Sequence, residues 1–150
     1  RQLGMQTHVI AAGRGINDGM GAFVADQVLE AIQKPARVLI LGITFKENVP
    51  DTRNSKVCDV IRHLEKNGCE VFVEDPHASE HDIEVLKVKK VDPADTNFDA
   101  VLLLVPHNEF IALGTEKIAA RAKSGGLVYD LKSVLSGEKI EASGRRYLAL

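Results

Sequence analysis

The stretch VLILGITFKENVPDTRNS, residues 38–55, decides the fold of this chain. It opens with an apolar run, residues 38–41, which is rich in β-branched side chains and ends at Gly42. Such a run is typical of a strand that is buried on both faces, and therefore of a parallel strand. After a polar loop, Asn54 or Ser55 can cap a helix. The apolar positions of that helix recur at helical spacing and are Val57, Val60, Ile61 and Leu64.

The loop between this strand and helix carries two cationic side chains, Lys46 and Arg53. A helix N-terminus offers free N–H groups and the positive end of its dipole, so the loop is a candidate seat for phosphate. Neither GxGxxG nor GxxxxGK[ST] occurs here, which indicates that side chains rather than the backbone would approach the anion. The alternative is a loop of solvated charges in which Asp51 pairs with Arg53.

Strand-like and helical segments alternate along the rest of the chain. Strands are expected at residues 70–74, 88–91, 99–105, 127–130 and 147–150, with 99–105 central and 147–150 at an edge. Short helices are expected within 77–86, at 109–113 and at 115–123, and a hairpin or loop at 134–139. This alternation predicts an α/β fold with a Rossmann-like, doubly wound parallel sheet. Ligands of such sheets bind beyond the carboxyl ends of the strands, here residues 42–53, 75–77, 106–108 and 130–132.

A long α-helix is predicted before the sheet, over residues 16–32. Apolar side chains recur at helical spacing from Ile16 to Ile32, and Pro35 ends the pattern. Taken alone, the pattern fits an ordinary packing helix. We divide the chain into a helical region, residues 1–35, and a Rossmann-like domain, residues 36–150.

Composition limits the possible partners and the compartment. Of the 150 residues, 45% are hydrophobic and 27% charged, and the net charge is −2. We therefore expect no nucleic-acid partner and no membrane association. The two cysteines are too few for a disulfide framework, so we expect a cytoplasmic protein. The chain starts at Arg1 rather than at Met, which suggests a piece of a longer protein.

Five motifs carry a family resemblance over nearly the whole chain. They are GITFKENVPDTRNSKV at 42–57, AGRGINDGMGAFVADQV at 12–28, EDPHAS at 74–79, DAVLLLVPHNEF at 99–110 and VYDLKSVL at 128–135. In this order they resemble the C-terminal, UDP-binding domain of the UDP-glucose/GDP-mannose dehydrogenase family. The FKEN and PDTRNS variants are most similar to enzymes that oxidise UDP-N-acetylhexosamines for surface polysaccharides.

The resemblance implies an activity for the complete enzyme. Members of the family oxidise the sugar C6 alcohol to a carboxylate with two NAD⁺, which the N-terminal domain binds. It also implies that this domain binds the UDP end of the UDP-sugar substrate, and that the helix at residues 16–32 forms the core of a homodimer. We expect the isolated fragment to be inactive. The alternative is a stand-alone nucleotide-binding or regulatory module, since these residues contain no catalytic constellation.

The resemblance also assigns substrate-binding residues. It implies that Lys46 contacts the UDP-sugar and that Phe45 lines the uracil side of the pocket. Arg53 either contacts the ligand or pairs with Asp51 to shape the loop. Lys132 lies where relatives carry a cation that reaches the UDP-sugar, although a solvated surface lysine is the alternative. Asp130 either fixes Lys132 or caps a turn.

Other polar residues receive no ligand in this interpretation. An acid at the position of Asp75 can bind a ribose, but Asp-Pro more often ends a strand in a turn, which we favour. The family nucleophile lies in a Gly-Gly-x-Cys motif that is absent here, so we assign no catalytic residue and interpret Cys58 and Cys69 as structural. Four of the five histidines lack metal-ligand spacing and are expected in loops rather than at a metal. They are His63, His77, His81 and His107.

Overall fold

The predicted sheet is present in the computed structural model, which describes residues 20–32, 36–44, 57–91 and 95–149. Its strands are β1 (Arg37–Leu41), β2 (Glu70–Glu74), β3 (Lys89–Lys90), β4 (Phe98–Leu103), β5 (Ala122–Asp130) and β6 (Arg146–Ala149). Every pairing is parallel and the order is β3-β2-β1-β4-β5-β6. This is the order of a Rossmann-like, doubly wound sheet, which confirms the predicted fold class.

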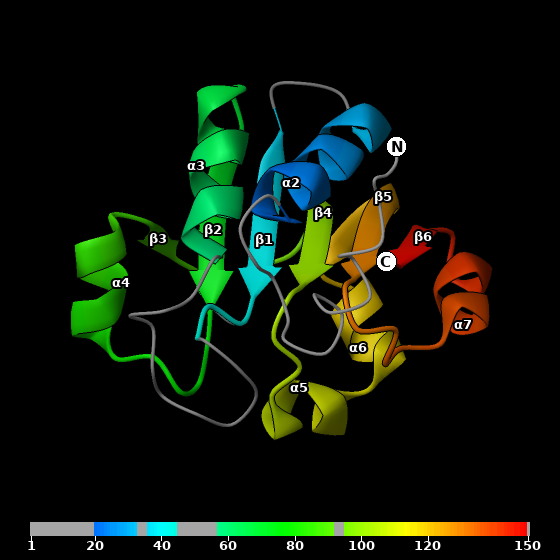
Figure 1. Cartoon of the computed structure of the whole chain (residues 1–150). Coiled ribbons are helices and arrows are strands. Elements are labelled where there is room, and N and C mark those ends of the chain that lie inside the picture. Colours follow the sequence, from blue (N-terminus) through cyan, green and yellow to red (C-terminus); the bar gives the residue numbers. More distant parts are fainter. Residues whose placement is uncertain (1–19, 33–35, 45–56, 92–94, 150) are drawn as a thin grey trace.

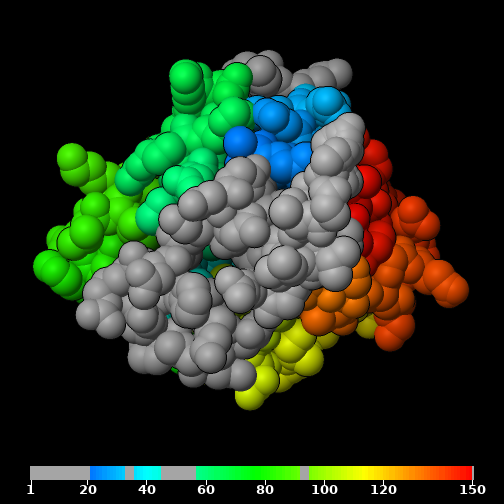
Figure 2. Space-filling view, viewed as in Figure 1, coloured from blue at the N-terminus to red at the C-terminus, as the bar shows by residue number. Residues whose placement is uncertain are grey.

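Helices cover both faces of the sheet (Figure 1). The described helices are α2 (Met20–Ala31), α3 (Val57–Lys66), α4 (Glu80–Leu86), α5 (Asn108–Leu113), α6 (Thr115–Ala119) and α7 (Gly137–Ala142). On one face α2 and α3 lie in front of the central strands (Figure 1), and the two helices are neighbours on the surface (Figure 2). Buried side chains of α5, α6 and α7 pack on the opposite face.

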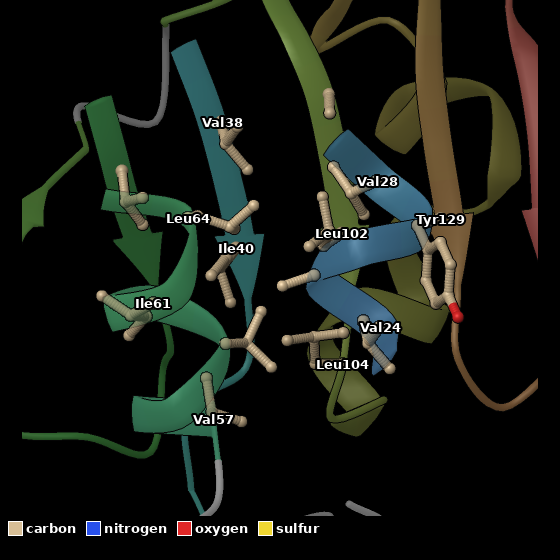
Figure 3. Packing of buried hydrophobic residues seen from close by; sticks show 14 of the residues in the cluster. Val24, Val28, Val38, Ile40, Val57, Ile61, Leu64, Leu102, Leu104 and Tyr129 are labelled. Carbon is tan, nitrogen blue, oxygen red and sulfur yellow. The ribbon is translucent and has the colours of Figure 1, made fainter. Parts of the chain in front are cut away.

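Strand β1 is buried on both faces, as its apolar run predicts. Val38 and Ile40 point into the cluster that contains α2 and α3, and Figure 3 shows Ile61 and Leu64 of α3 packed against them. Leu39 and Leu41 alternate with these residues and belong to the cluster on the other face. Because successive side chains of a strand point to opposite faces, four consecutive apolar residues serve two separate cores.

Most predicted elements are found close to their expected positions. Strand β2 matches residues 70–74, β4 lies centrally between β1 and β5, and β6 is an edge strand. The four apolar positions predicted for α3 are its buried residues. Helix α2 occupies residues 20–31 of the predicted long helix, while Ile16 and Pro35 lie outside the described residues.

One predicted connection and the end of one predicted helix are wrong. The hairpin alternative at residues 134–139 fails because β6 runs parallel to β5, so the connection must cross over. That crossover contains α7, whose N-cap Ser136 accepts a hydrogen bond from the Lys139 backbone N–H. The helix predicted for residues 115–123 ends at Ala119, because Ala122 already pairs with Phe98 as the first residue of β5.

Within the described part of the chain, no helix is both long and apolar enough to cross a bilayer.

Candidate functional site

Four parallel strands end at the same edge of the sheet, in the lower half of the view in Figure 1. The chain passes from β1 to β2 and β3 on one side, and later returns to place β4, β5 and β6 on the other. The direction of winding therefore changes between β1 and β4. Parallel α/β sheets bind ligands beyond the carboxyl ends of the strands at such a change of direction.

A buried carboxylate, that of Asp75, lies just after β2 at this edge. Its Oδ2 accepts hydrogen bonds from the backbone N–H groups of Ile43 at 2.6 Å and Thr44 at 3.2 Å. Its Oδ1 accepts one from the backbone N–H of His77 at 2.7 Å. Asp75 also begins the expected turn, since its carbonyl accepts the Ala78 N–H at 3.3 Å. The carboxylate thus connects the end of β2 to the first residues beyond β1.

The imidazole of His107 completes this connection from the end of β4. His107 is fully buried, and its Nε2 lies 3.0 Å from both Asp75 Oδ2 and Thr44 Oγ1. The ring packs against His77, with centroids 4.4 Å apart, and against Phe110 at 5.8 Å. Asp75, His107 and Thr44, which we call the rim cluster, therefore tie three strand ends together across the change of winding direction.

The ionisation of Asp75 follows from these contacts. Burial alone would raise the pKa of this carboxyl group. The hydrogen bonds from the His107 ring and from the backbone N–H groups of Ile43 and His77 outweigh burial and hold the pKa below its usual value. The ionised carboxylate can only accept hydrogen bonds, so the Nε2 of His107 carries the proton that lies between them.

Glycine is required where β1 ends. Gly42 has a φ of +94°, and a Cβ atom at this position would lie 2.5 Å from the carbonyl oxygen of Val105. The backbones after β1 and β4 are held together here, because the Leu104 N–H donates to the Leu41 carbonyl at 3.0 Å. A side chain at Gly42 would therefore separate two strand ends of the site.

The end of β5 holds Lys132 in a turn. The Ser133 N–H donates to the Asp130 carbonyl at 3.3 Å, and Ser133 adopts a φ of +55°. The buried Asp130 carboxylate accepts the backbone N–H groups of Val134 at 3.1 Å and Leu135 at 2.8 Å. Of the two roles considered for Asp130, the contacts show the turn cap.

A pocket of about 410 Å³ opens beside the rim cluster. Apolar side chains from α4 and α5 line it, among them Ile83, Phe110 and Leu113. Its polar lining includes Asp75 and Glu109, and Glu109 Oε1 lies 3.0 Å from His77 Nε2. The volume falls in the range of small-molecule sites, beyond the carboxyl ends of β2 and β3.

The structure can be compared with only part of the predicted site. Phe45, Lys46 and Arg53 lie outside the described residues, whereas Lys132 lies half-buried just beyond the carboxyl end of β5. Among residues 20–32, 36–44, 57–91 and 95–149, no three His, Cys, Asp or Glu side chains gather as a metal site would require.

Sequence reasoning missed the rim cluster. His107 was expected to be a loop histidine, and it does precede α5, but its ring is completely buried. The available signal was its position in VPHNEF, directly after the most apolar strand. A histidine at the carboxyl end of a central strand is placed to meet residues from neighbouring strand ends.

Curated relatives match nearly the whole chain. It is 40% identical to UDP-N-acetyl-D-glucosamine 6-dehydrogenase of Pseudomonas aeruginosa, over 93% of this chain and 35% of the relative. It is 35% identical to Protein CapL of Staphylococcus aureus, over 97% of this chain and 36% of the relative. The chain thus spans about a third of the length of these relatives.

Solved structures of longer chains contain the same fold. The UDP-N-acetyl-mannosamine dehydrogenase Cap5O from S. aureus superposes with a TM-score of 0.65 at 28% identity, over 95% of this chain and 34% of that one. The NDP-N-acetyl-D-galactosaminuronic acid dehydrogenase from Methanosarcina mazei Go1 superposes with a TM-score of 0.72 over 89% of this chain and 29% of that one; at 21% identity it supports the fold alone.

A family model completes the comparison. Residues 39–137, from β1 to the first residue of α7, match the model described as "UDP-glucose/GDP-mannose dehydrogenase family, UDP binding domain". The matched residues include the rim cluster, Asp130 and Lys132. On this match and on the 40% identity over 93% of its length, the chain belongs to the UDP-glucose/GDP-mannose dehydrogenase family.

Proposed function

We propose that this chain is the UDP-sugar-binding, C-terminal part of an NAD-dependent nucleotide-sugar 6-dehydrogenase that acts in polysaccharide biosynthesis. The observation that carries the proposal is the match of residues 39–137 to the UDP-binding domain of the family. Two of the relatives named above are a UDP-N-acetyl-D-glucosamine 6-dehydrogenase and a UDP-N-acetyl-mannosamine dehydrogenase, which favours a UDP-N-acetylhexosamine as the substrate.

The proposed role of the domain is to bind and orient the substrate. A diphosphate carries negative charge that suits one flexible ammonium group and one planar guanidinium, and we assign these to Lys46 and Arg53. Phe45 would line the uracil, and Lys132 would reach the ligand from the end of β5. Binding energy at the UDP end would then orient the distant C6 alcohol for oxidation.

NAD is a poor fit to the end of β1. A dinucleotide requires a glycine-rich turn with backbone N–H groups available for its pyrophosphate. Here Gly42 is followed by Ile43 and Thr44, whose N–H groups donate to Asp75. We therefore assign NAD, the hydride acceptor, to a domain outside this chain.

We further propose that the enzyme is a cytoplasmic homodimer whose interface contains the helix at residues 16–32. Phe23 supports this assignment, because it lies on α2 and is 47% exposed although most apolar side chains of the helix are packed inward. A nucleotide-sugar substrate is consistent with the cytoplasm. Analytical ultracentrifugation of the full-length protein, with Phe23→Glu as the disrupting variant, tests the dimer.

The function is tested by titrating UDP, UDP-GlcNAc and GDP into the full-length protein by calorimetry. We expect UDP and UDP-GlcNAc to bind, and Lys46→Ala to weaken UDP about tenfold, the effect of one lost charged hydrogen bond. Lys117→Ala, an exposed lysine on α6, is the control and should bind as the parent does. If Lys46→Ala binds as tightly as the parent, the phosphate assignment is wrong.

The coding sequence upstream of Arg1 separates this proposal from a stand-alone nucleotide-binding module. A GxGxxG strand-turn-helix and a Gly-Gly-x-Cys motif there would support the dehydrogenase. The absence of both would favour the regulatory module.

A further inference from the structure

We propose that Asp75 and His107 are positioning residues for UDP-sugar binding, because they fix the backbone at Ile43 and Thr44. This inference rests on the proposed function and deepens it. Phe45 and Lys46, the proposed ligand residues, follow Thr44 directly in the sequence. The backbone of Thr44 is therefore the last described point before the proposed ligand residues, and the rim cluster fixes that point.

The contacts that fix this backbone come from elements distant in sequence. Asp75 accepts the N–H groups of both Ile43 and Thr44, at 2.6 and 3.2 Å. His107, 63 residues beyond Thr44, contacts the threonine hydroxyl at 3.0 Å. Each strand end contributes one side chain, so a shift of β2 or β4 relative to β1 would break at least one hydrogen bond.

The same arrangement holds Asp75 itself in place. The carboxylate Oδ2 accepts hydrogen bonds from three donors, namely two backbone N–H groups and the His107 ring. Without the His107 ring, the Asp75 carboxylate would remain buried near the apolar Phe110 and would lose the hydrogen bond that His107 donates from beyond the end of β4. A buried carboxylate with fewer donors turns toward water or becomes protonated, and either change weakens its hold on the N–H groups of Ile43 and Thr44.

A purely structural role is the competing explanation. The core beneath the cluster is apolar and already extensive, with both clusters of buried side chains reaching the carboxyl ends of β1 and β4. A buried hydrogen bond adds only about 1 kcal/mol of net stability, whereas its length and direction restrict where its two partners can lie. The cluster also lies at the edge where the sheet binds ligands, which favours positioning.

The experiment compares His107→Leu with His107→Gln in the full-length enzyme. Gln can present an N–H donor near the position of Nε2, whereas Leu fills space without a donor. His63→Leu is the matched control: His63 also contacts a carboxylate, Asp26 at 2.8 Å, but on the exposed surface of α2 and α3. For each protein we would measure the Kd for UDP per folded molecule, and the KM values for UDP-sugar and NAD.

We expect His107→Leu to raise the Kd for UDP and the KM for UDP-sugar about tenfold, with an unchanged KM for NAD. In His107→Gln the Kd for UDP and the KM for UDP-sugar should stay within about threefold of the parental values. In His63→Leu both constants should equal the parental values. A loss of stability alone would lower the active fraction and leave all three constants unchanged. Parent-like constants in His107→Leu, or equal losses in the Leu and Gln variants, would overturn the proposal.

A second variant covers the case in which His107→Leu does not fold. Thr44→Val keeps the shape of the side chain and removes the hydroxyl that contacts His107. We expect it to raise the Kd for UDP about threefold, and an unchanged Kd would overturn the proposal. If Lys46→Ala weakens UDP binding while these variants do not, the positioning role fails and the proposed function stands. If the parent protein does not bind UDP, both fail.

Discussion

The hydroxyl group of Tyr147, on the edge strand β6, donates a hydrogen bond of 2.8 Å to the buried carboxylate of Asp130 at the end of β5. The same Oδ2 atom accepts the Leu135 backbone N–H, and Oδ1 accepts that of Val134. One carboxylate therefore holds both the edge strand and the turn that contains Lys132.

We predict that Tyr147→Phe and Asp130→Ala separate these two roles. Tyr147→Phe removes one hydrogen bond and should lower the free energy of unfolding by about 1 kcal/mol, with unchanged UDP affinity because the turn keeps both backbone bonds. Asp130→Ala leaves three donors without their acceptor and should cost about 3 kcal/mol and weaken UDP binding as well. Urea denaturation and calorimetry measure the two quantities. Equal UDP affinity in both variants would show that the turn does not position Lys132.

Gly42 and Gly68 make a second matched pair, because both have positive φ values, +94° and +91°. A Cβ atom at Gly68 would meet nothing within 4 Å, whereas one at Gly42 would collide with Val105. Gly68→Ala should therefore cost about 1 kcal/mol through backbone strain alone. Gly42→Ala should cost about 3 kcal/mol, since overpacking adds to the strain. Urea denaturation measures both, and similar losses would mean that β1 and β4 can separate without penalty.

Elements governed by local pattern were predictable from the sequence. The apolar run of β1 has no polar residue to face water, so a parallel, doubly covered strand follows. The spacing of the four apolar residues in α3 defines one buried face, which the structure confirms. In both cases the signal lies within one turn or one strand of the residue concerned.

Elements governed by tertiary contacts were not predictable. Residues 122–126 of β5 read AKSGG, a polar and glycine-rich composition without strand character, and Ala122 enters the sheet by pairing with Phe98. The rim cluster joins Asp75 to His107 across 32 residues, and only the sheet order brings their strand ends together. Three predicted ligand residues, Phe45, Lys46 and Arg53, remain predictions because they lie outside the described residues.

The lowered pKa of Asp75 predicts a loss of stability in acid. Burial opposes its ionisation, but hydrogen bonds from His107, Ile43 and His77 keep the folded-state pKa below the unfolded value of about 3.9. The unfolded chain therefore binds this proton first, so the stabilisation is complete above about pH 4 and is lost as the pH falls through the folded-state pKa.

Asp75→Asn tests this relationship. The amide cannot be ionised, and its NH2 group would face the N–H groups that now donate to the carboxylate. We therefore expect the free energy of unfolding to fall by about 3 kcal/mol near neutral pH. Below about pH 4, which is the pKa of Asp75 in the unfolded chain, the free energy of unfolding of Asp75→Asn should also fall less steeply than that of the parent. The control is Asp26→Asn, which removes an exposed carboxylate that contacts His63 and lies outside the rim cluster. Parallel curves for Asp75→Asn and the parent would show that folding does not lower the pKa of Asp75.

At high pH the two tyrosines of the chain should cause stability to fall as the pH rises, the opposite of the trend in acid. Burial raises the pKa of Tyr129 to about 12, and burial together with the Asp130 hydrogen bond raises that of Tyr147 to about 12. The Tyr129 ring lies beside α2 near Val24 and Val28 (Figure 3), and its hydroxyl donates to Gln27 Oε1 at 2.5 Å. Both phenols therefore stay protonated in the folded chain at pH values where the unfolded chain ionises.

Absorbance titration of the 150-residue chain tests this prediction directly. Tyrosinate should appear near pH 10 in denaturant but near pH 12 in the folded chain, with stability falling between these values as the unfolded state loses protons first. In Tyr147→Phe the remaining signal belongs to Tyr129 and should keep the high pKa. Folded-state ionisation of Tyr129 near pH 10 would show that α2 leaves the sheet readily, because water must reach the phenol before it can ionise at its ordinary pKa.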